Sequence, residues 1–186
     1  MTKTALFLAA LLVTASASAQ TVKLQTTEGD IRIELNAEKA PKSVANFLQY
    51  VKAGHYNGVI FHRVIGNFMI QTGGYDAKLN QRPTKPPIPL ESGNGLPNLR
   101  GTVAMARTGD PNSATSQFFI NVVDNYNLNA DVGRTGTGYA VFGQVVEGME
   151  VVDKIRAVET KSVSVHENLP IKPIFITKAV IEPAKK

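Results

Sequence analysis

Two apolar runs meet in residues 61–74, which read FHRVIGNFMIQTGG, and a third occupies residues 116–121, which read SQFFIN. Branched and aromatic side chains dominate Ile60–Ile65 and Phe68–Thr72, and the turn-forming pair Gly66-Asn67 separates them. Short runs of this composition joined by two such residues are typical of a β-hairpin. The segment therefore predicts two antiparallel strands.

The alternation within these runs predicts two different faces. Because successive side chains of a strand point to opposite sides of the sheet, Met69 and Gln71 share one side, as do Gln117 and Phe119 on the later strand. Their neighbours are expected in the interior: Phe68, Ile70, Phe118 and Ile120. Arginine, glutamine, methionine and phenylalanine together suit a binding surface better than a core, so we expect a binding patch outside the sheet.

The flanking sequence adds further strands and two helices. Alternating patterns predict a hairpin over residues 22–35 and strands over residues 102–106, 117–122, 139–146 and 174–181. Apolar residues at helical spacing predict a helix over 41–53, opened by Pro41 and followed by Gly54, and a short second helix through Met149, Val152 and Ile155. Residues 75–99 contain five prolines and little periodicity, which indicates an irregular surface loop.

These elements predict a mainly β fold. Eight short strands and two helices fit a closed eight-stranded antiparallel β-barrel whose ends the helices cap. The composition agrees, since 186 residues that are 43% hydrophobic can form one globular domain, and 15 glycines with 10 prolines favour strands and turns over a helical bundle. The absence of cysteine excludes disulfides, thiolate metal sites and cysteine nucleophiles.

The N-terminus has the pattern of a secretory signal peptide. Lys3 precedes the apolar run Ala5–Val13, and Ala17-Ser18-Ala19 is a small-residue cleavage sequence. We therefore expect a signal peptide over residues 1–19, cleavage after Ala19, and a domain over residues 20–186 in the periplasm. A retained membrane anchor is the weaker alternative, because nine apolar residues are far fewer than the ~20 that span a bilayer.

The charge of the mature chain does not favour a nucleic-acid partner. Loss of Lys3 leaves 19 basic and 15 acidic residues, a net charge of +4 that is too small to indicate binding to phosphate backbones. After signal cleavage we expect no membrane association.

The two quoted segments resemble the cyclophilin family of peptidyl-prolyl cis-trans isomerases, most closely its secreted bacterial members. Residues 61–74 match the family pattern F-H-R-V-I-x-x-F-M-I-Q-x-G-G, residues 116–120 match S-Q-F-F-I, and residues 139–145 resemble its V-F-G-x-V strand. The similarity extends from about Val22 to Ile181. It implies a cyclophilin-like eight-stranded barrel with two helices and a proline-binding groove on the outer surface.

Carried over by position, the resemblance implies a catalytic role for Arg63, with Gln71 beside it. It also implies a proline pocket and an adjoining substrate-binding wall made by eight further residues: Phe68, Met69, Ala106, Arg107, Gln117, Phe119, Leu128 and Tyr139.

The sequence departs from the family pattern at several of these positions. Asn127 stands where many members have tryptophan or another aromatic residue, and Tyr139 stands where many have histidine. Arg107 and Thr108 replace the common asparagine and alanine. These departures predict weak or reduced cyclosporin binding.

Other kinds of chemistry are not favoured. His62 is expected to be a packed or hydrogen-bonded structural residue, because isomerisation transfers no proton. His55 and His166 have no ligand-spaced partners, so we expect no metal and no cofactor. The glycine-rich residues 133–138 match no phosphate-loop spacing, and the serines lack the G-x-S-x-G setting of a hydrolase.

The sequence thus predicts a monomeric peptidyl-prolyl cis-trans isomerase that acts on proline-containing polypeptides, among them unfolded exported proteins. Arg63 is expected to stabilise the twisted imide beside an apolar proline pocket. The alternative is a proline-segment binding module or chaperone with little catalysis, which Asn127 favours because a large apolar wall is missing. A third possibility is an unrelated barrel with a structural role.

Overall fold

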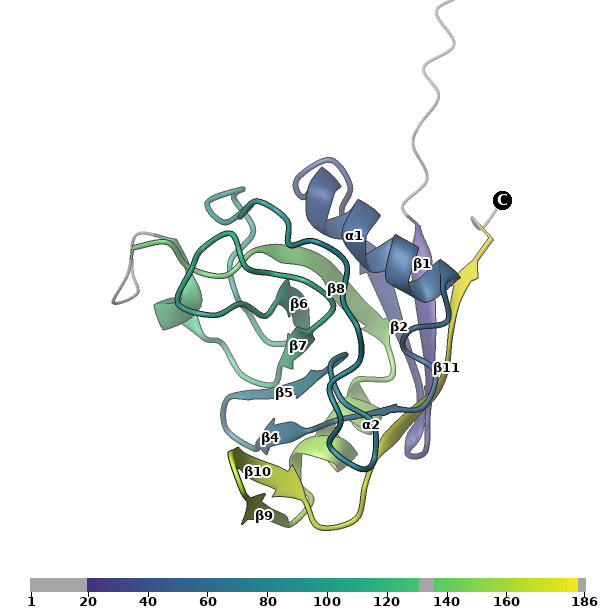
Figure 1. Cartoon of the computed structure of the whole chain (residues 1–186). Coiled ribbons are helices and arrows are strands. Elements are labelled where there is room, and N and C mark those ends of the chain that lie inside the picture. Colours follow the sequence, from purple (N-terminus) through teal and green to yellow (C-terminus); the bar gives the residue numbers. More distant parts are fainter. Residues whose placement is uncertain (1–19, 131–135, 184–186) are drawn as a thin grey trace, which may run out of the picture.

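The computed structural model describes residues 20–130 and 136–183, and its strands form one large curled sheet and one hairpin (Figure 1). The strands of the large sheet are β1 (Thr21–Thr26), β2 (Gly29–Leu35), β3 (Val59–Ile60), β4 (Arg63–Ile65), β5 (Met69–Thr72), β6 (Thr102–Met105), β7 (Phe118–Asn121), β8 (Val141–Glu147) and β11 (Phe175–Glu182). The hairpin is formed by β9 (Thr160–Val163) and β10 (His166–Pro170). The helices are α1 (Pro41–Lys52), the 3-10 turn η1 (Tyr126–Leu128) and α2 (Met149–Arg156).

The order of strands in the large sheet is β3-β11-β1-β2-β8-β6-β7-β5-β4, and every pairing is antiparallel. The two edge strands, β3 and β4, are separated in the chain only by Phe61 and His62. The Phe61 N–H donates to the carbonyl of Ile174 on one side, and the His62 N–H donates to the carbonyl of Gln71 on the other. The chain therefore crosses directly from one edge of the curled sheet to the other.

The expected closed eight-stranded barrel is approximately right. The strand expected over residues 60–65 is interrupted at Phe61–His62, so the described part of the sheet has nine strands, and β3 and β4 together correspond to one strand of the expected eight. The edges are joined by the chain itself rather than by a continuous ladder. The expected mainly β class and the two α-helices agree with the structure.

The main core fills the inside of the curl. Alternate residues of the first hairpin, among them Val22, Leu24, Ile31 and Ile33, are completely buried, as the period of two in the sequence predicts. Helix α1 packs on β8 and β11, and α2 packs on β2, β4 and β5. Figure 1 shows the two helices well separated along the sheet, α1 in the upper part and α2 in the lower part. Neither described α-helix is long and apolar enough to cross a bilayer.

Helix α1 receives its N-terminal cap from a distant part of the chain. The N-cap residue Ala40 offers no side-chain acceptor, but the Glu91 carboxylate accepts hydrogen bonds from the N–H groups of Lys42 (2.9 Å) and Ser43 (2.7 Å). A carboxylate at a helix N-terminus satisfies free N–H groups and interacts favourably with the helix dipole. Residues 75–99, expected as an irregular loop, are mostly irregular and are anchored to the helix by this contact.

Two elements were not expected from the sequence. The hairpin β9–β10 lacks a glycine turn, and residues of positive φ, Ser164 (53°) and Asn168 (57°), bend it instead. Only Leu169 and Pro170 of this hairpin are buried, so it lacks the apolar alternation that would have revealed it. The expected signal peptide, residues 1–19 with the cleavage point after Ala19, lies outside the described residues, as does part of the glycine-rich segment 133–138.

Candidate functional site

A small cavity of about 100 Å³ opens on the outer face of strands β4, β5 and β7. It is lined by nine of the ten residues singled out in the sequence: Arg63, Phe68, Met69, Gln71, Ala106, Arg107, Phe119, Leu128 and Tyr139. The tenth, Gln117, is bonded to a lining residue, since its Oε1 accepts a hydrogen bond from Gln71 Nε2 at 2.9 Å. The structure therefore brings all ten predicted residues together.

Strand register explains why these side chains converge. Arg63 of β4 lies opposite Gln71 of β5, and Gln71 lies opposite Phe119 of β7. Directly opposed residues in antiparallel strands point to the same face, with Cβ atoms about 4.5–5.5 Å apart. Three adjacent strands thus place a cation, an amide and an aromatic ring in one row.

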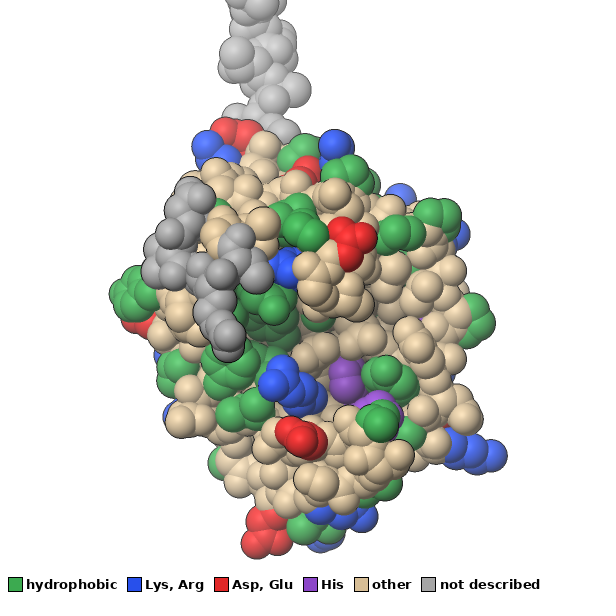
Figure 2. Space-filling model, turned by 60° about the vertical axis from the view of Figure 1, so that its left-hand side comes forward, with side chains coloured by type: hydrophobic (Ala, Val, Ile, Leu, Met, Phe, Trp, Pro, Cys, Tyr) green, Lys and Arg blue, Asp and Glu red, His purple; other side chains and the backbone are tan. Residues whose placement is uncertain are grey.

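The floor of the cavity is apolar. Met69, Phe119 and Leu128 are almost fully buried and form a second hydrophobic cluster with Ala104 and Val141, separate from the main core. On the neighbouring residues the structure agrees with the predicted alternation, since Ile70, Phe118 and Ile120 belong to the main core. Figure 2 shows this face of the molecule, where hydrophobic side chains lie beside basic ones.

Alternation placed Phe68 in the interior, which was wrong, whereas the family resemblance placed it in the proline pocket, where the structure has it. Phe68 packs against the second cluster and lines the cavity. The reason is local: strand β5 begins at Met69, and Phe68 belongs to the turn that closes with the hydrogen bond from its N–H to the carbonyl of Ile65 (2.9 Å). Alternation holds only within a strand, so it does not apply to this residue.

The two arginines of the cavity differ in their partners. Arg107 donates to the carbonyls of Gly138 and Thr108 and to Thr137 Oγ1 at 2.8–3.0 Å, and its guanidinium lies 4.6 Å from the centre of the Tyr139 ring. The Arg63 side chain makes no hydrogen bond and no ion pair with any described residue. A guanidinium has five N–H donors in a fixed plane, so Arg63 offers donors to a ligand while Arg107 holds the Tyr139 wall.

Burial keeps His62, beside Arg63, in its neutral form. Only 5% of His62 is exposed, the centre of its ring lies 4.8 Å from that of Tyr75, and its Nδ1 atom has no hydrogen-bond partner in the part of the chain that the structure describes. Burial, and secondarily the neighbouring His166, lower its pKa to about 4. The structure agrees that His62 is packed, and at neutral pH it carries no charge.

A buried asparagine network behind the cavity was not predicted. Asn98 Nδ2 donates to the carbonyls of Leu128 (3.2 Å) and Tyr139 (3.3 Å), and Asn125 Nδ2 donates to the carbonyl of Phe68 (2.8 Å). Asn121 joins the two by donating to Asn98 Oδ1 and accepting from Asn125 Nδ2. The network fixes three wall residues from behind. The sequence signal was weak, because asparagines near turns usually face solvent.

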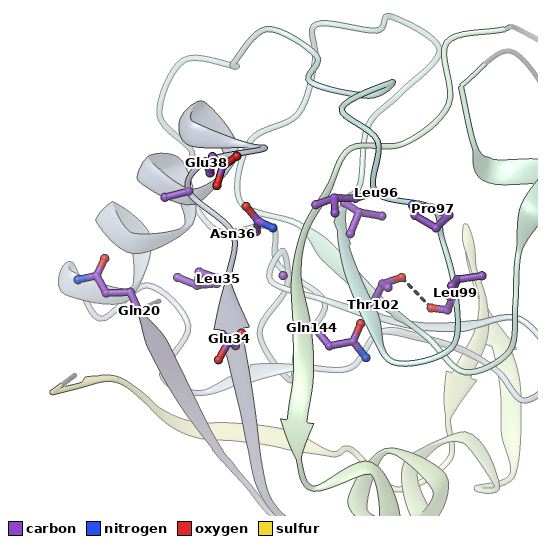
Figure 3. A pocket seen from close by; sticks show the side chains of 13 residues that line it. Gln20, Glu34, Leu35, Asn36, Glu38, Leu96, Pro97, Leu99, Thr102 and Gln144 are labelled. Atoms are coloured by element: carbon purple, nitrogen blue, oxygen red, sulfur yellow. Dashed lines mark hydrogen bonds between the residues drawn. The ribbon is translucent and has the colours of Figure 1, made fainter. Parts of the chain in front are cut away.

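A larger cavity, of about 600 Å³, lies elsewhere, between the end of β2, the segment 96–99 and β8 (Figure 3). Its charged lining residues are Glu34 and Glu38, and Leu35, Leu96 and Val141 contribute apolar surface. Since the described lining contains no cation, this cavity offers no charged donor to an amide nitrogen. No three described acidic or histidine side chains come together as a metal site.

Comparisons with known proteins agree on one family. The model described as "Cyclophilin type peptidyl-prolyl cis-trans isomerase/CLD" matches residues 21–181. A "Peptidyl-prolyl cis-trans isomerase" of Acinetobacter baylyi is 53% identical over 181 residues, which cover 97% of this chain and 95% of the relative. "Peptidyl-prolyl cis-trans isomerase B" of Escherichia coli is 50% identical over 161 residues, which cover 86% of this chain and 98% of the relative.

Solved structures support the same conclusion. A crystal structure of a Cryptosporidium parvum cyclophilin type peptidyl-prolyl cis-trans isomerase, obtained in the presence of the dipeptide Ala-Pro, superposes with a TM-score of 0.73 at 28% identity. The superposition covers 88% of this chain and 99% of the other.

Proposed function

Because the chain belongs to the cyclophilin-type peptidyl-prolyl cis-trans isomerases, and has their activity, we propose that Arg63 supplies the decisive interaction with the twisted X-Pro bond. The observation that carries this proposal is that the Arg63 guanidinium lines a cavity with an apolar floor and is bonded to no residue that the structure describes. The proline ring is expected to lie on Met69, Phe119 and Leu128, with its imide nitrogen toward Arg63.

The reaction needs an electrostatic and steric catalyst rather than a nucleophile. Amide resonance gives rotation about the bond a barrier of ~18–20 kcal/mol, and no covalent bond changes. In the twisted state the prolyl nitrogen is pyramidal and its lone pair can accept a hydrogen bond. A donor that binds this lone pair favours the twisted state over both planar forms, which is the condition for catalysis.

Arg63 and Gln71 have different roles in the proposed mechanism. The Arg63 guanidinium is always protonated and donates to the imide nitrogen. Gln71 lies directly opposite it across the strand pair, and its amide is fixed by the 2.9 Å bond to Gln117. A fixed amide holds the substrate carbonyl without a further entropic cost.

A site of this kind can supply a rate enhancement of the size expected for an isomerase. Shortening a minute to milliseconds requires about 6–7 kcal/mol of preference for the twisted state. A preorganised hydrogen-bond donor contributes about 3–4 kcal/mol. The remainder is assigned to the apolar pocket, which holds the ring while the preceding residue rotates.

The test compares Arg63→Ala with wild type in a solvent-jump assay on an Ala-Pro peptide. We expect kcat/KM to fall about 10²- to 10³-fold, in line with the loss of one preorganised donor, while the peptide dissociation constant changes little. Arg63→Lys keeps the charge but loses the planar arrangement of donors, so its kcat/KM should lie between those of wild type and Arg63→Ala. Equal kcat/KM in wild type and Arg63→Ala would remove Arg63 from the mechanism.

A second candidate is that binding of proline segments is the main role of this chain, with isomerisation slower than its family membership leads us to expect. It is favoured by Asn127, which is exposed in η1 and adds no apolar wall to the cavity. This candidate predicts that peptide binding survives in Arg63→Ala and that wild type accelerates isomerisation hardly more than the variant does. The same position and Tyr139 support weak cyclosporin binding, which a titration would measure directly.

We also propose that the enzyme acts in the periplasm on exported polypeptides as a monomer. The support is the sequence of residues 1–19, with its basic start, apolar run and Ala-Ser-Ala end. N-terminal sequencing of protein from a periplasmic extract should give Gln20 as the first residue. Soluble cytoplasmic protein that still begins with Met1 would contradict the proposal.

A further inference from the structure

A second cleft of about 160 Å³ adjoins the proline pocket and has no role in the mechanism above. It is lined by His62, Arg63, Val165, His166 and Glu167. Arg63 lines both cavities, so a ligand in the proline pocket lies directly beside this cleft. The outer wall comes from hairpin β9–β10, whose strand β10 lies against β4. Figure 2 shows histidine side chains together on this face, beside basic and acidic ones.

The inner wall is rigid. The rings of His62 and His166 both pack on Tyr75, each with its centre 4.8 Å from the Tyr75 ring centre, and they lie 6.5 Å from each other. Rings fixed in this way lose little freedom when a ligand arrives. The wall is therefore preformed.

One hydrogen-bonding atom of His62 has no partner among the described residues. The residue is 95% buried, as its 5% exposure shows, and Nδ1 is bonded to no described residue. A buried polar atom without a partner is destabilising. A polar atom of a ligand that reached Nδ1 from the cleft would give this buried group a partner.

The charges around the cleft have opposite signs. Arg63 carries a positive charge and Glu167 a negative one, and no ion pair joins the two among the described residues. His62 adds no charge at neutral pH, since its pKa is about 4. A carboxylate side chain would meet Glu167, and an ammonium group would meet Arg63. A neutral group with both a donor and an acceptor avoids either repulsion.

Resting on the proposed function, we propose that this cleft binds the carboxamide side chain of a glutamine or asparagine residue that flanks the substrate proline. The amide oxygen accepts from Arg63 or from an imidazole N–H, and the amide N–H₂ donates to Glu167. Consecutive residues of an extended peptide lie about 3.3 Å apart, so a residue one or two positions from the proline reaches the neighbouring cleft.

The experiment uses the mature protein and the reference peptide Ala-Ala-Pro-Ala-Ala. Each alanine is replaced in turn by Gln, Glu, Lys or Leu, and kcat/KM is measured for every peptide. At one position we expect the Gln peptide to exceed the Glu, Lys and Leu peptides about three- to tenfold, the equivalent of one or two neutral hydrogen bonds.

Two variants connect this preference to the cleft. His166→Ala should reduce the ratio of Gln to Leu peptides towards one, chiefly through KM. Glu167→Gln removes the negative charge of the cleft, so kcat/KM for the Glu peptide should rise relative to kcat/KM for the Gln peptide. Ser162→Ala, an exposed residue of the same hairpin outside the cleft, serves as the matched control and should leave all ratios unchanged.

The outcomes separate this proposal from the one on which it rests. Turnover of the reference peptide by wild type and its loss in Arg63→Ala report on the mechanism alone. If that result holds but no position prefers Gln, or if the preference survives both His166→Ala and Glu167→Gln, the assignment of the cleft is overturned.

Discussion

At the scale of single residues, the site shows that the partners of a side chain decide its role. Arg63 and Arg107 line the same cavity, yet Arg107 uses its donors on Gly138, Thr108 and Thr137, whereas Arg63 uses none on described residues. The family pattern predicted that both would lie at the site. It could not distinguish a guanidinium that holds a wall from one that is open to a ligand.

His62 gives a prediction at this scale. In the unfolded chain its pKa is near 6.5, so it binds a proton as the pH falls below that value, whereas folded His62 stays neutral until about pH 4. Between these values the unfolded state binds more protons, and the contribution to stability, complete above pH 6.5, is lost as the pH falls towards 4. The loss amounts to about 3 kcal/mol.

Urea unfolding at pH 7 and pH 4 measures this loss. The variant His62→Asn cannot titrate, so its free energy of unfolding should fall about 3 kcal/mol less than that of wild type over this range. A ¹⁵N titration of wild type gives the direct check. If the His62 imidazole titrates near pH 6.5 in the folded protein, burial does not lower its pKa and this prediction is contradicted.

At the scale of elements, local patterns predicted most strands and both α-helices. The period of two in residues 22–35 and the helical spacing of Val44, Phe47 and Val51 each matched the buried face in the structure. These signals suffice because burial repeats with the geometry of the element. Alternation failed at Phe68 because a turn holds that residue, and it missed hairpin β9–β10 because the hairpin has almost no buried face.

Contacts between distant segments could not be read from local patterns. Glu91 caps a helix that begins some fifty residues earlier, and Asn98 meets Asn121 and Asn125 behind the cavity from a separate segment. A polar residue in a loop has the same local sequence signal whether it faces solvent or a buried carbonyl. Only the closure of the sheet decides between the two.

The asparagine network yields a prediction at this scale. Asn98→Ala removes the side-chain donor of the Tyr139 carbonyl and one of the two donors of the Leu128 carbonyl, which still accepts from the Tyr139 N–H. We expect the free energy of unfolding to fall by about 2–3 kcal/mol. KM for an Ala-Pro peptide should also rise several-fold, because two wall residues lose their support. The same truncation at the exposed Asn67 should change stability by less than about 0.5 kcal/mol. Equal effects at the two positions would show that the network does not support the pocket.

At the scale of the whole molecule, the curl of the sheet creates two separate apolar clusters. The main core lies inside the curl, and the smaller cluster around Met69 and Phe119 lies outside it. The sheet closes through the chain at Phe61–His62, which also places Arg63 at the start of β4, between the proline pocket and the second cleft. The closure of the fold and the position of the site thus have one cause.

Substitution of Phe47 tests how much the main core contributes to stability, because this residue does not line the candidate site. Its ring lies 5.2–5.3 Å from those of Tyr56, Phe118 and Phe142, and so joins α1 to strands β7 and β8. Phe47→Ala should lower the free energy of unfolding by about 3–5 kcal/mol, measured by urea denaturation. Phe47→Leu should lower it by about 1 kcal/mol. A loss below 1 kcal/mol for Phe47→Ala would mean that the helix is not held by this ring cluster.

The most direct test of the central claim is the rate of isomerisation on the enzyme itself. Magnetisation-exchange NMR at saturating Ala-Pro peptide measures the interconversion of the bound cis and trans forms, independently of affinity. We predict that Arg63→Ala slows this interconversion about 10²-fold or more, while the dissociation constant of the peptide stays within a few-fold of the wild-type value. The same interconversion rate in both proteins, or a loss of rate matched by an equal loss of affinity, would contradict the account.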